Sequence, residues 1–172
     1  MLRYVKATRQ CLKDENWHAA LFIALSMPDI CGWLEDPKRK SGERFVDWFN
    51  RYLAQAYAPL ASDPWLTGGD CYALRCALLH SGVGDISAQR IRNILDEFCF
   101  ISPDSKGGVH GISGHCNRVT NCQFNDRMFD EALFLRVTDF CEDICKAVEK
   151  WVTDTAGDPD IKSRMSELLT IY

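Results

Sequence analysis

The chain has 172 residues, of which 47% are hydrophobic and 26% charged, and its formal net charge at pH 7 is −4. These values are ordinary for a globular protein and exclude an intrinsically disordered chain, while the length fits a single domain with its own core. The negative charge argues against a protein that binds nucleic acid over its whole surface, but it leaves room for a local basic patch.

The N-terminal segment carries recurring charges and has no pattern of a secretory signal. The apolar stretch 19–27 ends at Pro28 and is shorter than a membrane span. The nine cysteines are scattered, and an odd number cannot all pair within one chain. Free thiols in a reducing compartment explain this distribution, so we expect a cytoplasmic protein that makes no contact with a membrane.

The spacing of apolar residues predicts helices in the first third of the chain. One covers 2–12, and a second covers 17–25 with Asn16 as its cap; Pro28 kinks or interrupts it before 30–34 continue it. After a polar turn at 36–40, Ser41 is expected to cap a third helix, which places its apolar residues on one face: Phe45, Trp48, Phe49, Tyr52, Leu53 and Ala56.

A loop at 59–64 separates these helices from the apolar run 71–80, which predicts a fourth helix ended by the glycines at 82 and 84. The next segment, 86–96, is interpreted as a short helix, and 98–101 as a strand. The glycine-rich stretch 102–125 indicates a loop with one or two short strands.

A long helix is expected over 126–153, with an inward stripe that contains Leu133, Val137, Phe140, Ile144, Val148 and Trp151. Asp158 and Pro159 then start a final helix as its cap and first turn. Amphipathic helices must bury their stripes on each other, so we expect one mainly all-α domain over 1–172. This domain is a helix bundle with a small β or irregular insertion near 97–125.

Arg75 and His80 are the most suggestive chemical pair in the sequence. Arg75 lies on an otherwise apolar helix, where a charge costs free energy unless it is paired or functional. His80 lies in the last turn, where the helix dipole favours a protonated imidazole. Five residues turn an ideal helix by about 140° and raise it by about 7.5 Å, so the two side chains meet most easily across two subunits.

The segment Arg75-Cys76-Ala77-Leu78-Leu79-His80 resembles the Arg-x4–6-His signature of HEPN domains, and its flanks, Tyr72-Ala73-Leu74 and Ser81-Gly82, are similar to the surroundings of that motif. HEPN domains are helical bundles of bacterial toxins, phage-defence systems and RNA-processing factors. The resemblance implies a metal-independent endoribonuclease without a cofactor, with Arg75 and His80 as catalytic residues. It also implies a homodimer with a shared cleft, and as partners RNA and a cognate antitoxin or nucleotidyltransferase-like protein.

In such an enzyme His80 would move the proton of the RNA 2′-hydroxyl, and Arg75 would hold the scissile phosphate. Active members often carry a polar residue directly after the arginine, whereas this chain has Cys76. A second interpretation therefore stays open, in which the chain is a non-catalytic helical dimerisation or interaction module. In that case Arg75 pairs with a carboxylate such as Asp70 or one from another helix.

A third interpretation is a zinc site on the loop that contains His110, His115, Cys116 and Cys122, although this spacing matches no usual zinc module. Cys141 and Cys145, one helical turn apart, are interpreted as small core residues. The best local basic patches are 38–40 with Arg44, and Arg90 with Arg92. Each patch is interpreted as a solvated face rather than as a track for RNA.

Overall fold

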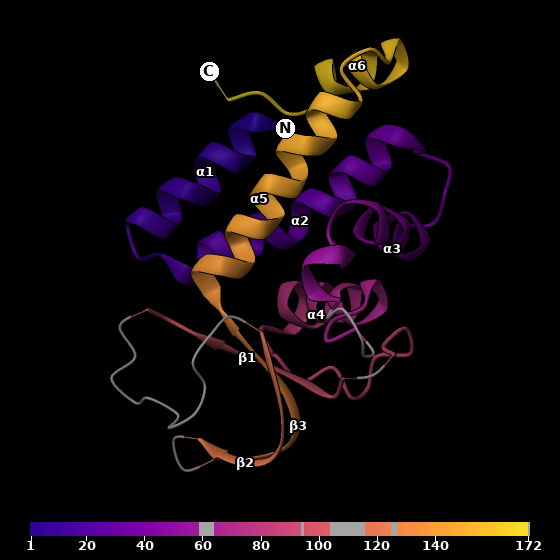
Figure 1. Ribbon diagram of the computed structural model, residues 1–172. Helices are drawn as coiled ribbons and strands as arrows, with labels where there is room; N and C mark the ends of the chain where they lie inside the picture. The colour runs from indigo at the N-terminus through magenta and orange to yellow at the C-terminus, as the bar shows by residue number, and fades with distance from the viewer. Residues whose placement is uncertain (59–63, 94, 104–115, 125–126, 172) are drawn as a thin grey trace.

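The computed structural model describes residues 1–58, 64–93, 95–103, 116–124 and 127–171 (Figure 1). The described part is mainly helical with a three-stranded sheet, so the mainly helical expectation is confirmed. In chain order the helices and strands are α1 (Leu2–Lys13), α2 (Trp17–Glu35), α3 (Ser41–Tyr52), the 3₁₀ helix η1 (Ala54–Tyr57), α4 (Gly68–Ser81), β1 (Glu97–Ile101), β2 (Asn117–Phe124), β3 (Arg127–Arg136), α5 (Val137–Asp154) and α6 (Pro159–Ser166).

Helix α2 is the centre of the bundle, because it contacts α1, α3, α4, α5 and α6. Its residues Ala24, Leu25 and Met27 are fully buried. Figure 1 shows α1, α2 and α5 side by side, with α4 at the end of the bundle that faces the sheet. The hydrophobic core therefore runs along α2 and reaches the sheet through the residues at the start of α5.

Helix α2 runs through Pro28 to Glu35, so an interruption at Pro28 was wrong, while the continuation over 30–34 is confirmed. The full helix has 19 residues, and an 18-residue stretch of it has a mean hydropathy of 1.2, which is enough in length and composition to cross a membrane. Half of that stretch is buried inside the protein. A buried core helix has the same properties, so α2 is weak evidence for a membrane span.

The predicted helix caps are confirmed at Asn16 and Asp158 and wrong at Ser41, while Thr67 is a cap that was not predicted. Asn16 accepts a hydrogen bond from the backbone N–H of Ala19, Thr67 caps α4, and Asp158 caps α6. Ser41 is instead the first residue of α3, and its hydroxyl donates to Asp29 on α2. A contact between two helices thus takes the side chain that sequence reasoning had assigned to a cap.

The expected helix over 126–153 is wrong over Arg127–Arg136, which form β3. Strand β3 is the middle strand of the sheet, parallel to β1 and antiparallel to β2. Four consecutive apolar residues, 132–135, are buried on its two faces. A short continuous apolar run has the same periodicity in a buried strand and in a buried helix, which explains the error. Strand structure is therefore not confined to 97–125.

Residues 86–96 form turns and extended backbone in their described part, so the predicted short helix was wrong. The carboxylate of Asp70 accepts hydrogen bonds from the backbone N–H groups of Asn93 and Leu95, at 2.7 and 3.2 Å. These bonds to a distant residue replace the local bonds that a helix would need. The strand predicted at 98–101 is confirmed as β1.

Candidate functional site

Helix α4 carries both residues of the predicted site. Its first turn is fixed by Thr67, whose hydroxyl donates to the Asp70 carboxylate at 2.6 Å and accepts from the Asp70 backbone N–H at 3.1 Å. The helix ends at Gly82, which adopts φ +70°, a left-handed conformation that favours glycine. These two ends place Arg75 in the middle of the helix and His80 in its last turn.

Arg75 makes an ion pair with Asp29 on α2, with 3.0 Å between its Nη2 and the carboxylate Oδ2. The other carboxylate oxygen, Oδ1, accepts from Arg44 Nε at 3.1 Å and from the Ser41 hydroxyl at 3.0 Å. Of the two expected partners, a carboxylate from another helix is confirmed, whereas Asp70 instead holds the backbone of Asn93 and Leu95. Arg75 therefore belongs to a network that joins α2, α3 and α4.

The network around Asp29 contains two guanidinium groups for one carboxylate, which leaves one positive charge in excess. The three charged side chains are only 14–20% exposed, so water screens this charge weakly. The Nε of Arg75 is buried and has no hydrogen-bond partner among the described residues. The Tyr72 ring lies 5.9 Å from the Arg75 guanidinium carbon, where its face stabilises the cation.

His80 is exposed, and no hydrogen bond or ion pair in the described part of the chain involves it. None joins it to Arg75 either. Within one chain, Arg75 therefore lies on the side of α4 that faces α2, and His80 lies exposed at the C-terminal end of the helix. Cys76, which follows Arg75, is half-buried.

The described cysteines carry no disulfide, as predicted: Cys11, Cys31, Cys71, Cys76, Cys99, Cys116, Cys141 and Cys145. Burial raises the pKa of the Cys116 and Cys145 thiols to about 12. Such thiols stay protonated at neutral pH and are poor nucleophiles or metal ligands. Cys141 and Cys145 are buried in the core, as interpreted from the sequence.

The proposed zinc loop lies largely outside the described residues, which exclude His110, His115 and the side chain of Cys122. Within the described residues, no group of three or more His, Cys, Asp or Glu side chains could hold a metal ion.

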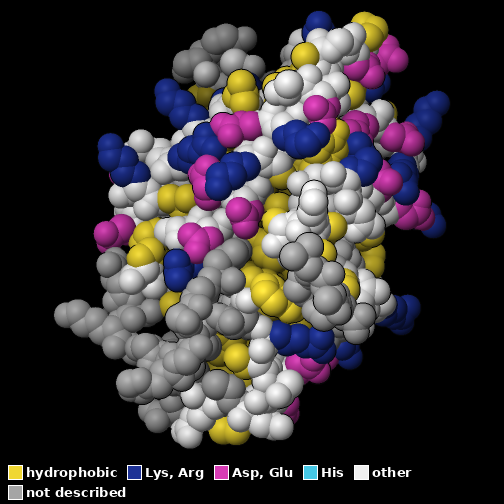
Figure 2. Space-filling view, viewed as in Figure 1, with side chains coloured by type: hydrophobic (Ala, Val, Ile, Leu, Met, Phe, Trp, Pro, Cys, Tyr) yellow, Lys and Arg dark blue, Asp and Glu magenta, His cyan; other side chains and the backbone are white. Residues whose placement is uncertain are grey.

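Three arginines of the expected basic patches lie beside acidic side chains, while Lys38 and Lys40 are exposed. Arg39 lies near Glu43 and Asp47, Arg44 pairs with Asp29, and Arg92 pairs with Asp96. Figure 2 shows the same mixture, with Lys and Arg side chains interspersed with Asp and Glu over the helical part of the visible face.

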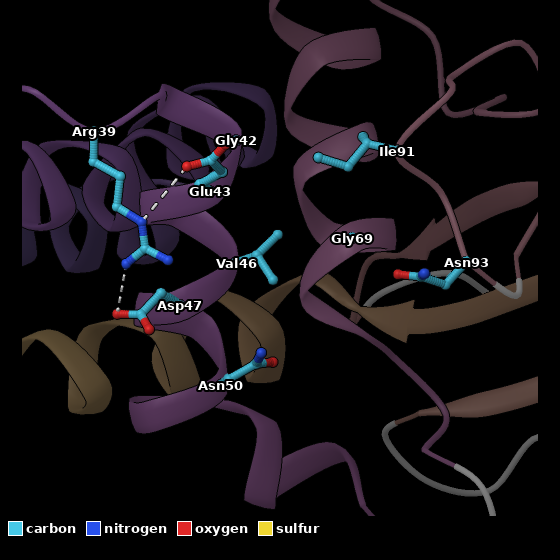
Figure 3. A pocket seen from close by; sticks show the side chains of 9 residues that line it. All are labelled: Arg39, Gly42, Glu43, Val46, Asp47, Asn50, Gly69, Ile91 and Asn93. Carbon is cyan, nitrogen blue, oxygen red and sulfur yellow. Dashed lines mark ion pairs between the residues drawn. The ribbon is translucent and has the colours of Figure 1, made fainter.

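A pocket of about 410 Å³ lies between α3 and the segment 91–93, beside the first turn of α4 (Figure 3). Sequence reasoning missed it. Its walls come from residues almost 50 positions apart, and nothing local in the sequence brings them together. The spacing Gly68-Gly69 before Asp70 was the one available signal of close packing at this place.

No family model matches the chain, and no similar protein was found among the curated proteins or among the solved structures.

Proposed function

We propose that the chain is a HEPN-like domain that cleaves RNA without a metal ion, in a cleft formed by two copies of the chain. The observation that carries the proposal is the placement of the two motif residues on α4. His80 is exposed and unbonded at the end of the helix, while Arg75 is held inside the Asp29 network with one positive charge in excess. One group is free to move a proton, and the other is fixed as a source of positive charge.

The proposed reaction uses the nucleophile of RNA itself. The 2′-oxygen attacks phosphorus and the bond to the 5′-oxygen breaks, which gives a cyclic phosphate and a free 5′-hydroxyl. The 2′-hydroxyl proton goes to an imidazole, and the leaving 5′-oxygen takes a proton from another acid. His80 and His80 of the partner subunit supply these two groups, while a guanidinium stabilises the charge on the phosphate.

The resemblance of the Arg75–His80 segment to HEPN domains suggests a toxin or phage-defence role, with a cognate antitoxin or nucleotidyltransferase-like protein as partner. A second function, a non-catalytic interaction module, is favoured by the ion pair between Arg75 and Asp29. This pair gives Arg75 a structural task that needs no substrate.

The two functions predict opposite results for two variants, His80→Ala and Arg75→Lys. For a nuclease, each variant loses about 10²–10⁴-fold in RNA cleavage while the melting temperature stays close to that of the wild type, because lysine keeps the charge near Asp29. His18→Ala is the matched control, since His18 is another exposed histidine on α2. Cleavage should survive EDTA and should not occur on DNA, which lacks the 2′-hydroxyl.

Wild-type protein that cleaves no RNA would overturn the nuclease. If Arg75→Ala in addition melts at a clearly lower temperature, because alanine removes the positive charge that lysine keeps near Asp29, the structural role is established.

A further inference from the structure

The pocket between α3 and the segment 91–93 has the size of a small-molecule site, at about 410 Å³. Figure 3 shows Val46 on α3 and Ile91 extending into the gap from opposite sides. Ile91 Cδ1 lies against Gly42 of α3 and Val46 Cγ1 against Gly68 of α4, so the two branched side chains form an apolar lining on which the face of a ring can pack. The lining thus favours a planar heterocycle over an extended or bulky ligand.

The wall that carries Ile91 is held in place before any ligand binds. A Cβ added at Gly69 would lie 2.0 Å from Asn93 Oδ1 and 2.6 Å from the Ile91 carbonyl oxygen, so glycine alone permits this close approach. The buried Asp70 carboxylate fixes the Asn93 backbone from below. The ligand therefore meets a formed pocket, which lowers the entropy cost of binding.

The polar rim combines carboxylates with one guanidinium. Arg39 lies 3.6 Å from the Asp47 carboxylate and 3.9 Å from that of Glu43. Both distances are longer than a hydrogen bond, so the Arg39 donors and the Glu43 carboxylate keep their capacity to bind a ligand. Asp47 Oδ2 accepts from Arg51 Nε at 3.0 Å, and its second lone pair and the other oxygen, Oδ1, are the acceptors that Asp47 can offer a ligand. Asn50 adds an exposed amide at the same rim.

This set of groups matches the edges of guanine better than those of the other bases. Guanine presents two adjacent N–H donors to a carboxylate and two acceptors, O6 and N7, to a guanidinium fork. Adenine and cytosine would place a ring-nitrogen acceptor against the carboxylate, and uracil would place carbonyl oxygens on both sides of its single donor. Asp47 and Arg39 together thus discriminate for guanine.

A phosphate does not fit inside the pocket, because Arg39 is outnumbered there by Glu43 and Asp47. Exposed Lys38 and Lys40 flank Arg39 outside the pocket, where they can meet a backbone phosphate. We propose that this pocket binds a guanine base of single-stranded RNA, with the RNA backbone along the 38–40 turn. This inference rests on the proposed function and names a base preference for its substrate.

The test uses 2′-O-methyl RNA hexamers, which the wild-type protein cannot cleave through a 2′-hydroxyl. A uridine hexamer with one guanosine should bind about tenfold more tightly than the uridine hexamer or its adenosine counterpart, as measured by fluorescence anisotropy. Asp47→Asn and Val46→Trp should each remove this preference. Asp154→Asn should retain it, since Asp154 is matched to Asp47 in exposure and also pairs with a basic residue one helical turn away.

Equal binding of all hexamers overturns the inference, as does a guanosine preference that survives both pocket variants. A second arm titrates guanosine and adenosine monophosphates and follows backbone amide shifts of Gly42 and Gly69. Shifts with the guanosine nucleotide alone, without a preference in RNA, assign the pocket to a free nucleotide and overturn the RNA assignment. Cleavage is measured separately, so a nuclease without guanosine preference defeats only this inference, and guanosine binding without cleavage defeats only the proposed function.

Discussion

At the scale of single residues, Asp29 does more than neutralise a charge. It lies on α2 one helical turn before Gly32, where a Cβ would come within 3.1 Å of the Arg44 carbonyl oxygen. This close approach of α2 and α3 brings the Arg44 guanidinium to Asp29, and α4 supplies Arg75 from another direction. One carboxylate therefore sets how three helices meet and where the Arg75 guanidinium stands.

The variant Asp29→Ala should cost about 3 kcal/mol in the free energy of unfolding, because it leaves two poorly exposed guanidinium groups without their partner. The comparison is Asp154→Ala, which breaks an exposed pair with Lys150 and should cost far less than Asp29→Ala. Urea denaturation measures both. Equal, small losses would show that the Asp29 network adds nothing beyond a surface ion pair.

At the scale of helices and strands, the sequence predicts the helix ends that depend on neighbouring residues. The caps Asn16 and Asp158 and the left-handed Gly82 identify helix ends because their bonds are made within a few residues. Strand β3 was not predicted, because its apolar run forms a strand through pairing with β1 and β2 on its two sides.

The candidate site was predictable in part for the same reason. Arg75 and His80 stand out on an apolar helix, and the need of Arg75 for a carboxylate follows from the cost of a buried charge. Its partner Asp29 lies 46 residues away and could not be chosen from the sequence, although an aspartate inside an apolar helix was a visible signal. The pocket beside α4 depends on tertiary contacts alone.

The variant Asp70→Ala tests whether the Asp70 carboxylate holds the backbone at Asn93 and Leu95 in place. The carboxylate is fully buried and accepts from two backbone N–H groups, and each bond to a charged group contributes about 1.5–3 kcal/mol. We expect faster hydrogen exchange at Asn93 and Leu95, a large loss of stability and a loosened pocket wall. The control is Asp36→Ala, because in the described structure the Asp36 carboxylate accepts only an exposed local bond from the backbone N–H of Lys38. Unchanged exchange at residues 93 and 95 in Asp70→Ala would contradict this role.

At the scale of the whole molecule, a net charge of −4 and mixed surface charges give little general attraction for RNA. A nuclease built on this chain must therefore gather its positive charge locally, and a second copy doubles the charge at the cleft. The divergence of about 140° between Arg75 and His80 on α4 also favours a site that two copies of the chain share. Two helices that meet at their His80 ends would bring the two imidazoles together at the cleft, with the excess charge of each Arg75 network behind them.

The last prediction is that the chain forms a homodimer through the end of α4. Val83 follows Gly82 directly and is 44% exposed, which makes it the apolar residue nearest to His80 beyond the helix. Light scattering of the wild type should give twice the chain mass of 19.6 kDa at micromolar concentration. Val83→Asp should shift this to the monomer, because it buries an unpaired charge in the interface, and RNA cleavage should fall with it while the melting temperature is retained. Phe22→Asp is the control, since Phe22 is 40% exposed on α2 and should leave the dimer intact. A wild-type monomer, or a Val83→Asp monomer that cleaves RNA at the wild-type rate, would remove the shared cleft from the mechanism.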